Sequence, residues 1–378
     1  MDKKIIMQIR GPTLFADSLR YKLPNSFRKA YASFVKNGEY IIYRYSLGTF
    51  GMMSLKSIFL WEFVYSPWII HRLARRGFHM VSCGLMGWWA FLAFIFAKAL
   101  GRPVVVGDNH WYWPSTFFAK LHFPLSRLVA QHSTLLYLTR GASIFWREVG
   151  IPVEKMRIGF PPDYVPKLDI GRKDILRTEE IRRCLGLESK AIVLFFGRLI
   201  KKKGVEFLIR AFKRIHNEHK DVFLLICGDG PERANLEKLC RDLGISNVLF
   251  YGFVEPEDKN ALFLICDIFV YPSITLEIPE EWPLAVCEAM SVGKPVIVTN
   301  AVGSVKDGLV RHGFNGLVVS EKNVESLYKA MDILLRDDRL RSIMGENARK
   351  TIQEDFAYSK GFKRLHEVWE EALSLCYV

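Results

Sequence analysis

Short runs rich in isoleucine and valine recur along the whole chain, and longer stretches with helical spacing separate them. This alternation is typical of parallel β-sheets covered by helices on both faces, because each parallel strand needs a crossover connection. The first half contains KIIMQIR, EYIIYRYS, HMVSCG, RPVVVGDNH, TLLYLTR and KMRIGF. The second half contains AIVLFFGR, VFLLICGDG, VLFYGFV, DIFVYPS, KPVIVTN and NGLVVS. We therefore predict an α/β fold with two doubly wound, Rossmann-like domains.

A polar, highly charged stretch separates the two series of strands, and 378 residues suffice for two domains. We predict an N-terminal domain over residues 1–165, a linker over 166–189 and a second domain over 190–355. A helix over 356–378 is expected to pack back on the N-terminal domain. Because open α/β sheets bind ligands at the carboxyl ends of their strands, we expect the two domains to face each other across a ligand-binding cleft.

The positive charge of the chain is confined to the predicted N-terminal domain. The formal net charge is +13, and residues 1–165 hold 21 Lys and Arg against 8 Asp and Glu, which accounts for the whole excess. A basic surface attracts nucleic acid, anionic lipid or phosphorylated substrates. The sequence has neither zinc-finger spacing nor an RNA-binding aromatic signature, so we expect no nucleic-acid partner. An anionic membrane surface or lipid phosphate is the favoured partner.

The seven cysteines form no CxxC pair and lie mostly in apolar runs, which predicts buried thiols and a reducing compartment. The sequence shows no signal peptide, and the apolar stretch at 84–100 is shorter than the roughly 20 residues that span a bilayer. We expect a buried or interfacial helix there. These features favour a cytoplasmic protein. The basic N-terminal domain further suggests peripheral attachment to the inner face of the membrane.

A basic loop follows the first strand of the second domain, in FFGRLIKKKGVEFLIRAF. The pattern predicts a strand, a tight loop with Arg198 and Lys203, and a helix that begins after Gly204. A guanidinium and an ammonium beside a helix N-terminus are suited to binding a diphosphate. The alternative is a solvated basic loop, which fits the two lysines just before Lys203 better than it fits Arg198 and Lys203.

Two further strands end at the same edge of the predicted sheet, in CGDG and YGFV. Arg233 stands where a dinucleotide fingerprint would have its third glycine, so CGDG alone is a weak signal. We expect backbone atoms at these strand ends to contact a nucleobase. The backbone N–H groups of Trp282 and Leu284 are expected to line the pocket beside the sugar. The residues expected to line the pocket are Gly197, Gly228, Gly252, Phe253, Trp282 and Leu284.

Two glutamates, Glu280 and Glu288, flank a Trp-Pro pair in EEWPLAVCEAM. Pro283 suits the first position of a helix that ends near Gly293, because proline has no N–H to leave unpaired. Glu288 then lies in an apolar helix, where an unpaired carboxylate is costly. Acids this close to a basic diphosphate site are suited to accept hydrogen bonds from ribose and sugar hydroxyls. The alternative, ordinary first-turn acids favoured by the helix dipole, fits their acidic neighbours better.

Five motifs occur in this order: FFGRLIKKKG, LLICGDGPE, LFYGFV, EEWPLAVCEAMSVGKPVIV and GFNGLVV. Over residues 190–355 the sequence resembles the donor-binding domain of family-four retaining glycosyltransferases of GT-B fold, and the resemblance is loose before that. It implies transfer of a sugar from a UDP or GDP donor to an acceptor hydroxyl with retention of the anomeric configuration. A hexose is the favoured sugar. The acceptor would be lipid-linked or a polysaccharide. The resemblance also implies that no metal or other cofactor takes part.

Position by position, Glu280 and Glu288 match the family's pair of glutamates, the first near the donor sugar and the second on the ribose. Arg198 and Lys203 match the pair that holds the diphosphate, and Asp307 falls where the family often has glutamate.

His110, at the end of VVVGDNH, resembles the N-domain histidine that reaches toward the donor sugar. With Glu280, it completes the catalytic residues that the resemblance implies. The alternative is a histidine that only closes a polar strand end, and Asp108 is the second candidate. The aromatic group HWYWP that begins at His110 is expected either to flank the acceptor or to belong to the core.

The chain departs from the family in two places. The usual Glu-Gly-Phe-Gly is here Glu280-Glu281-Trp282-Pro283, and the glycine pair that often follows the first strand is reduced to Gly11. These losses leave a second hypothesis, a catalytically inactive, membrane-associated scaffold of the same fold. Retention of all four charged donor contacts favours the enzyme.

Overall fold

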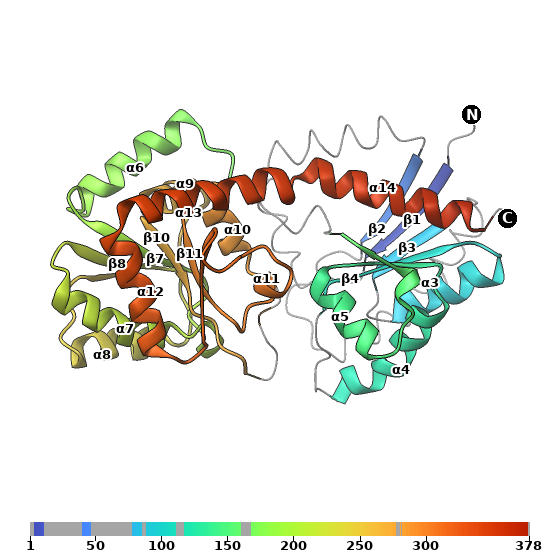
Figure 1. Cartoon of the computed structure of the whole chain (residues 1–378), viewed down its shortest axis with the longest axis horizontal. Helices are drawn as coiled ribbons and strands as arrows, with labels where there is room; N and C mark the ends of the chain where they lie inside the picture. Colours follow the sequence, from blue (N-terminus) through green and yellow to red (C-terminus); the bar gives the residue numbers. More distant parts are fainter. Residues whose placement is uncertain are drawn as a thin grey trace. The chain divides into compact units, whose positions relative to one another are not determined.

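The computed structural model describes residues 4–10, 40–46, 78–84, 88–110, 117–159, 168–276, 280 and 282–376, with the backbone alone for 4–10, 40–46, 88–90 and 117–119. The chain divides into two compact units. The first comprises Met1–Pro162 and Tyr358–Val378, and the second comprises Asp163–Ala357. Each unit has a six-stranded parallel sheet with helices packed against it (Figure 1), so the predicted α/β class is confirmed.

The sheet of the first unit has the strand order β2-β1-β3-β4-β5-β6, and β1 pairs in parallel with β2 on one side and β3 on the other. Its strands are β1 (Lys4–Arg10), β2 (Tyr40–Ser46), β3 (Met80–Gly84), β4 (Val104–Asp108), β5 (Leu135–Leu138) and β6 (Met156–Ile158). Its described helices are α3 (Trp88–Ala99), α4 (Phe117–His132), α5 (Arg140–Glu148), the short 3-10 turn η2 (Val153–Lys155) and α14 (Tyr358–Ser374). All six strands coincide with the apolar runs of the sequence.

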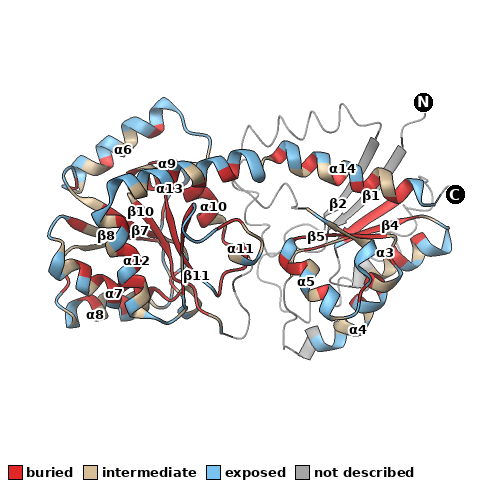
Figure 2. Cartoon of the chain, viewed as in Figure 1, coloured by how far each residue is buried: buried red, intermediate tan, exposed pale blue. Residues whose placement is uncertain are grey.

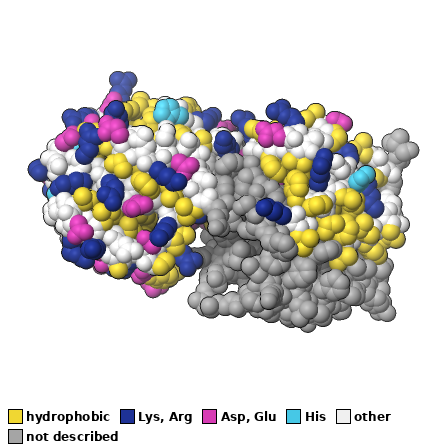
Figure 3. Space-filling view, turned by 90° about the horizontal axis from the view of Figure 1, so that it is seen from below, with side chains coloured by type: hydrophobic (Ala, Val, Ile, Leu, Met, Phe, Trp, Pro, Cys, Tyr) yellow, Lys and Arg dark blue, Asp and Glu magenta, His cyan; other side chains and the backbone are white. Residues whose placement is uncertain are grey.

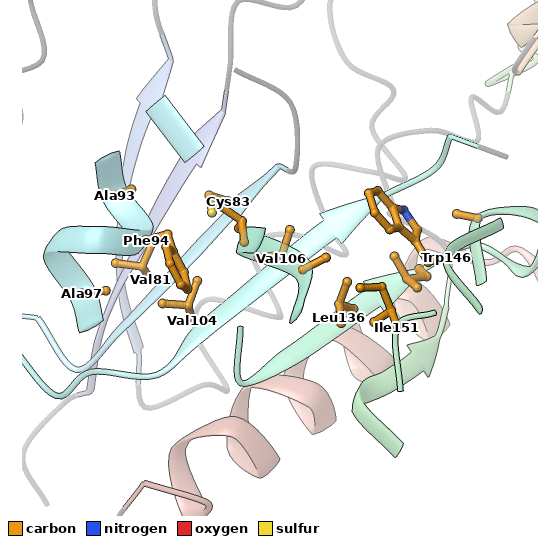
Figure 4. Packing of buried hydrophobic residues seen from close by; sticks show 14 of the residues in the cluster. Val81, Cys83, Ala93, Phe94, Ala97, Val104, Val106, Leu136, Trp146 and Ile151 are labelled. Atoms are coloured by element: carbon orange, nitrogen blue, oxygen red, sulfur yellow. The ribbon is translucent and has the colours of Figure 1, made fainter. Parts of the chain in front are cut away.

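Helices cover both faces of this sheet at β3, β4 and β5, and these three strands are therefore largely buried (Figure 2). On one face, α3, α4 and α5 pack through side chains such as Phe94 and Trp146, which lie among Val106 and its neighbours on the strands (Figure 4). On the other face, Trp369 and further residues of α14 pack on Val105 and adjacent strand residues. Burial on two faces explains why these strands appear as continuous apolar runs.

The C-terminal helix α14 belongs to the first unit, although the chain enters it from the second. Arg157 on β6 anchors it, because its Nε donates to Oε2 of Glu371 at 2.7 Å. The carboxylate of Glu371 lies beside a guanidinium, which lowers its pKa below the usual value. This is the segment for which the sequence predicts a helix packed on the N-terminal domain.

The sheet of the second unit has the order β12-β11-β10-β7-β8-β9. Its strands are β7 (Ala191–Phe196), β8 (Val222–Cys227), β9 (Val248–Gly252), β10 (Ile268–Tyr271), β11 (Val296–Thr299) and β12 (Gly316–Val319). Its helices are α6 (Arg172–Cys184), α7 (Val205–Glu218), α8 (Arg233–Asp242), α9 (Pro256–Ile265), α10 (Leu284–Ser291), α11 (Gly303–Lys306), α12 (Val324–Arg336) and α13 (Asp338–Lys350), with the 3-10 turn η4 (Lys201–Lys203) and the π-helical turn η5 (Thr351–Asp355). The strands again coincide with the predicted runs.

The stretch predicted as a linker, 166–189, contains helix α6 and is part of the second unit. Arg177 on α6 donates from Nε to Oδ1 of Asp258 on α9 at 2.7 Å, and Ile181 is buried. Most polar residues of this helix are exposed, but Asp174 is buried, and the apolar Ile175 and Leu176 are exposed. Such a helix is easily mistaken for a linker, because its few apolar residues do not follow one buried face.

The apolar stretch at 84–100 contains α3, and Ala93, Phe94 and Ala97 of this helix are buried. None of the described helices combines the length and the apolarity that crossing a bilayer requires. Five cysteines are buried as expected, while Cys184 and Cys376 are exposed.

Candidate functional site

The strand order of the second sheet reverses between β7 and β10, which are hydrogen-bonded neighbours. Ligands of open α/β sheets bind at such a reversal, beyond the carboxyl ends of the strands. Arg198 and Lys203 lie in the loop after β7, and Glu280 lies in the segment after β10. The structure therefore places three of the predicted charged residues at the edge where a ligand is expected.

Glycines allow the strand ends at this edge to lie in direct contact. Gly228 has φ +122, and a Cβ there would lie 2.1 Å from the carbonyl oxygen of Gly197. Gly204 has φ +62, and a Cβ there would lie 2.2 Å from the carbonyl oxygen of Pro272. The N–H of Gly228 donates to the carbonyl of Gly252 at 2.8 Å. Because no other residue type fits at Gly228 or Gly204, the loop after β7 lies against the ends of β8 and β10.

The Lys203 ammonium has two partners at this edge. Its Nζ donates to Oε2 of Glu280 at 2.7 Å and to the hydroxyl of Tyr271. The side chains of Lys203 and Glu280 are only 13% and 15% exposed, so this is a largely buried ion pair. An ammonium has three N–H donors, and among the described residues only two of them have an acceptor, so one donor remains for a ligand oxygen.

Arg198 is exposed, and its guanidinium forms no ion pair within the described part of the chain. The helix α7 begins directly after Gly204, and Val205, Leu208 and Phe212 are buried as the sequence predicts. The N–H groups at the start of this helix favour an anion. The loop thus presents a guanidinium, an ammonium donor and a helix N-terminus near one another along the chain.

The backbone of Glu280 is fixed by the short helix α11 rather than by α10. The carbonyl of Glu280 accepts a hydrogen bond from Gly303 at 2.8 Å, and Glu280 pairs with Val302 in an isolated parallel bridge. Asp307 follows α11, where its N–H donates to the carbonyl of Gly303 at 3.0 Å. The bridge holds the Glu280 carboxylate next to Lys203.

Glu288 lies inside α10 and is 8% exposed. The Nζ of Lys259, on α9, donates to its Oε1 at 2.7 Å. Burial raises the pKa of Glu288, and the positive charge of Lys259 opposes this shift. The sequence indicates that an unpaired carboxylate at Glu288 would be costly, but it does not indicate the partner. Lys259 is 29 positions away and belongs to no local motif. Pro283 precedes α10 as its N-cap, so the predicted helix start is off by one residue.

The remaining predicted pocket residues differ in exposure. Trp282 is buried, and its ring centre lies 6.1 Å from that of Phe356, so its indole is part of the core. Leu284 is half-buried at the start of α10. Phe253, directly after β9, is 68% exposed and is the aromatic side chain at this edge that is open to a planar ligand.

In the first unit, His110 lies two residues after β4, and its Nδ1 is hydrogen-bonded to Oδ1 of Asp108. The indole Nε1 of Trp146 donates to Oδ2 of the same carboxylate at 2.6 Å. Asp108 is 5% exposed and Trp146 is fully buried, so Asp108 connects the core to His110. The sequence indicated Asp108 as an alternative to His110, whereas the structure shows that the two are hydrogen-bonded to each other. The aromatic residues after His110, and Gly11, lie outside the described residues.

A cluster with metal-ligating groups lies elsewhere in the second unit. Ligand atoms of Glu218, His219 and Asp332 lie within 4.8 Å of one another. His219 is hydrogen-bonded to Asp332 at 2.7 Å, and Glu218 accepts from Tyr328 at 2.8 Å. The cluster lies at the C-terminal end of α7, which is the opposite edge of the sheet from Arg198. His219 and Asp332 pair with each other, Glu218 pairs with Tyr328 and Arg336, and all three lie away from the reversal of strand order.

Comparison with known proteins identifies the second unit. Residues 177–351 match the family described as glycosyl transferases group 1. The second unit belongs to this family. The group 1 region begins within α6 and ends at η5, and it includes Arg198, Lys203, Glu280 and Glu288.

Relatives of the group 1 unit differ in how much of this chain they match. An uncharacterized glycosyltransferase of Methanocaldococcus jannaschii is 33% identical over 196 residues, which are 51% of this chain and 48% of that protein. The alpha-D-kanosaminyltransferase of Streptomyces kanamyceticus is 27% identical over 302 residues, which are 76% of each protein. The chain thus spans about half the length of the first relative and about three quarters of the second.

Solved structures show the fold of the whole chain. HepE of Anabaena in complex with UDP is 17% identical, with a TM-score of 0.72 over 97% of this chain and 100% of that one. HepE in complex with UDP-glucose gives a TM-score of 0.67 over 97% and 99%. Two Rossmann-like domains of this kind constitute the GT-B fold, which the sequence predicts.

Proposed function

We propose that the protein is a retaining glycosyltransferase that moves a sugar from a nucleoside diphosphate sugar to an acceptor hydroxyl. A hexose is the favoured sugar. One observation supports this proposal above the others. In a group 1 unit, the strand order reverses at an edge that holds Arg198, Lys203 and Glu280, and Glu288 is buried in the adjoining helix.

The charges at this edge are suited to the parts of such a donor. Arg198 and the third N–H of Lys203 would bind the diphosphate, assisted by the N-terminus of α7. Glu288 would accept hydrogen bonds from the ribose hydroxyls, with Lys259 on its other side. The exposed ring of Phe253 would contact the base. HepE is solved with UDP and UDP-glucose, so UDP is the first nucleotide to test and GDP the second.

The proposed reaction breaks the bond between C1 of the donor sugar and the phosphate oxygen. A bond from C1 to the acceptor oxygen forms on the same face, and the hydroxyl proton passes to the departing phosphate. Arg198 and Lys203 would stabilise the charge that develops on the diphosphate, which is an electrostatic form of catalysis. Glu280 would contact the donor sugar, and His110 is the second catalytic residue that we propose. Because two cations and a helix N-terminus supply positive charge, we propose that neither a metal nor another cofactor takes part, and a chelator should leave turnover unchanged.

Release of the nucleoside diphosphate from a panel of UDP and GDP sugars tests this proposal directly. The wild-type chain should hydrolyse at least one donor slowly without acceptor, and Glu288→Ala should reduce this release by about tenfold or more, because it removes the proposed acceptor of the ribose hydroxyls. Glu346→Ala is the control, since Glu346 is paired with Lys350 on the surface of α13. Equal release by Glu288→Ala and the wild type would contradict the site. Binding of UDP without turnover of any donor would favour the inactive scaffold.

We also propose that the first unit binds the anionic cytoplasmic face of a membrane. It would bind a glycan or lipid-linked acceptor at that face. Its helices α3, α4 and α5 cover one face of the sheet, and their outer sides combine apolar and basic residues. Exposed members include Ile95, Leu121, Leu128 and Ile144, with Lys98, Lys120, Arg127 and Arg147. Figure 3 shows hydrophobic side chains gathered on the first unit, with basic groups among them. Glu148 is the one acidic residue in the sequence of these three helices.

Such a surface is suited to a bilayer with anionic lipids. Apolar side chains enter the interface, while each Lys or Arg near an anionic leaflet contributes about 1 kcal/mol. We expect the net positive charge of the N-terminal half to attract the anionic membrane through this surface of α3, α4 and α5.

A further inference from the structure

Tyr271, the last residue of β10, is the neutral partner of the Lys203 ammonium. Its side chain is fixed by the core. The ring stacks between Phe195 on β7, at 6.1 Å between centres, and Phe269 on β10, at 6.3 Å, and Tyr271 is 3% exposed. The hydroxyl therefore has a defined position at the reversal of the strand order.

The backbone of the basic loop is held against the end of β10, but this does not by itself orient the lysine. The N–H of Ile274 donates to the carbonyl of Lys202 at 2.9 Å, and Gly204 lies against the carbonyl of Pro272. Four side-chain torsions still separate Nζ of Lys203 from this backbone. Its position therefore depends on the groups that bind the ammonium itself.

Those groups are Glu280 and Tyr271, and they differ in what they do to the charge. Glu280 neutralises the ammonium, with Nζ and Oε2 2.7 Å apart. Tyr271 accepts a hydrogen bond without adding charge, and its ring lies 4.8 Å below the ammonium. Burial and the negative charge of Glu280 keep the pKa of Tyr271 well above its usual value, so the phenol remains neutral. A second carboxylate in this place would make the pair net negative and repel a diphosphate.

We propose that Tyr271 is a positioning residue, which holds the Lys203 ammonium with its third N–H directed to the donor diphosphate. This inference rests on the proposed function, because it assumes that a diphosphate binds at Lys203.

The test is calorimetric titration of the full-length chain with UDP and with uridine, or with GDP and guanosine if guanine is the base that binds. Tyr271→Phe keeps the stacked ring and removes the acceptor. We expect UDP to bind about tenfold more weakly, because a hydrogen bond to a charged group is lost, and uridine to bind as before. In a Lys203→Met background, Tyr271→Phe should have no further effect on UDP, because the group that it positions is absent.

Tyr328→Phe is the matched control. Tyr328 is also a buried tyrosine of the second unit, its hydroxyl donates to Glu218 at 2.8 Å, and the Arg214 guanidinium lies 3.6 Å from its ring centre. It lies on α12, outside the proposed site, so Tyr328→Phe should leave UDP affinity unchanged.

The outcomes distinguish a wrong diphosphate site from a wrong role for Tyr271. If Lys203→Met binds UDP like the wild type, the proposed diphosphate site itself is wrong. If Lys203→Met weakens UDP binding but Tyr271→Phe does not, the site stands and the role of Tyr271 is overturned. Equal weakening of UDP and uridine by Tyr271→Phe would show a merely structural role and also overturn it. Should Tyr271→Phe fail to fold, Tyr271→Leu, which also lacks the hydroxyl, replaces it in each comparison.

Discussion

Glu280 and Glu288 are separated by a simple spacing in the sequence but have different surroundings in the structure. Glu280 is held by the backbone of α11 and pairs with Lys203, whereas Glu288 is buried in α10 and pairs with Lys259. The cost of a buried carboxylate predicted that Glu288 needs a partner. The identity of the partner depends on how α9 packs beside α10, which no local pattern encodes. For the same reason the sequence did not reveal Tyr271, which appears only as one more apolar residue of a strand.

The protonation of Glu288 leads to a pH prediction. Burial raises the pKa of Glu288 above its ordinary value of 4.5, with Lys259 opposing the shift. A protonated carboxyl accepts ribose hydroxyls less well, so UDP affinity should begin to fall at a pH above that ordinary value as the solution is acidified. Calorimetric titrations of UDP from neutral to mildly acidic pH measure this. Glu288→Gln should bind UDP more weakly and lose this pH step, and an unchanged step in Glu288→Gln would assign it to another group.

The strands of both sheets could be predicted because they are short apolar runs, and β3, β4, β5, β7, β8, β10, β11 and β12 are largely buried. Helix α6 could not, because it has few apolar residues, two of which, Ile175 and Leu176, are exposed, and its polar residues resemble those of a linker. Of the candidate site, the charged loop after β7 could be predicted from its place between a strand and a helix. The pairing of Asp108 with both His110 and Trp146 could not, because Trp146 comes from α5, 38 positions after Asp108.

The contact between the ends of β7 and β8 allows a prediction at Gly228. A Cβ at this residue would lie 2.1 Å from the Gly197 carbonyl, so Gly228→Ala must displace the loop that carries Arg198 and Lys203. We expect UDP binding to weaken by about tenfold or more, since a charge-assisted hydrogen bond to the diphosphate would be lost. The control is Gly244→Ala, because Gly244 also has a positive φ, +63, but nothing lies within 4 Å of the added Cβ. If both variants lose UDP affinity equally, backbone strain rather than loop position would explain the loss.

The chain as a whole combines a group 1 unit of balanced charge with an N-terminal half that carries the excess of +13. This division predicts salt-dependent attachment to anionic membranes. The full-length chain should co-sediment with liposomes in proportion to their anionic lipid content at low salt, and high salt should release it, since exposed charges are screened over about 10 Å at 0.1 M.

Variants on α4 locate the membrane contact. Replacing both Lys120 and Arg127 by Gln should reduce co-sedimentation, because each would lose its contribution at an anionic leaflet. Replacing Lys350 and Arg349, basic residues at the end of α13, should not. Binding that ignores lipid charge and salt would refute the electrostatic account.

Retaining sugar transfer is tested by the anomeric configuration of the product. The wild-type chain is incubated with the nucleotide sugar that it turns over, in the presence of a simple alcohol as acceptor, and the glycoside is followed by proton NMR from its first appearance. We expect release of the nucleoside diphosphate together with a glycoside that has the same anomeric configuration as the donor. A product of inverted configuration, or no turnover of any donor by a chain that binds UDP, would contradict retaining sugar transfer.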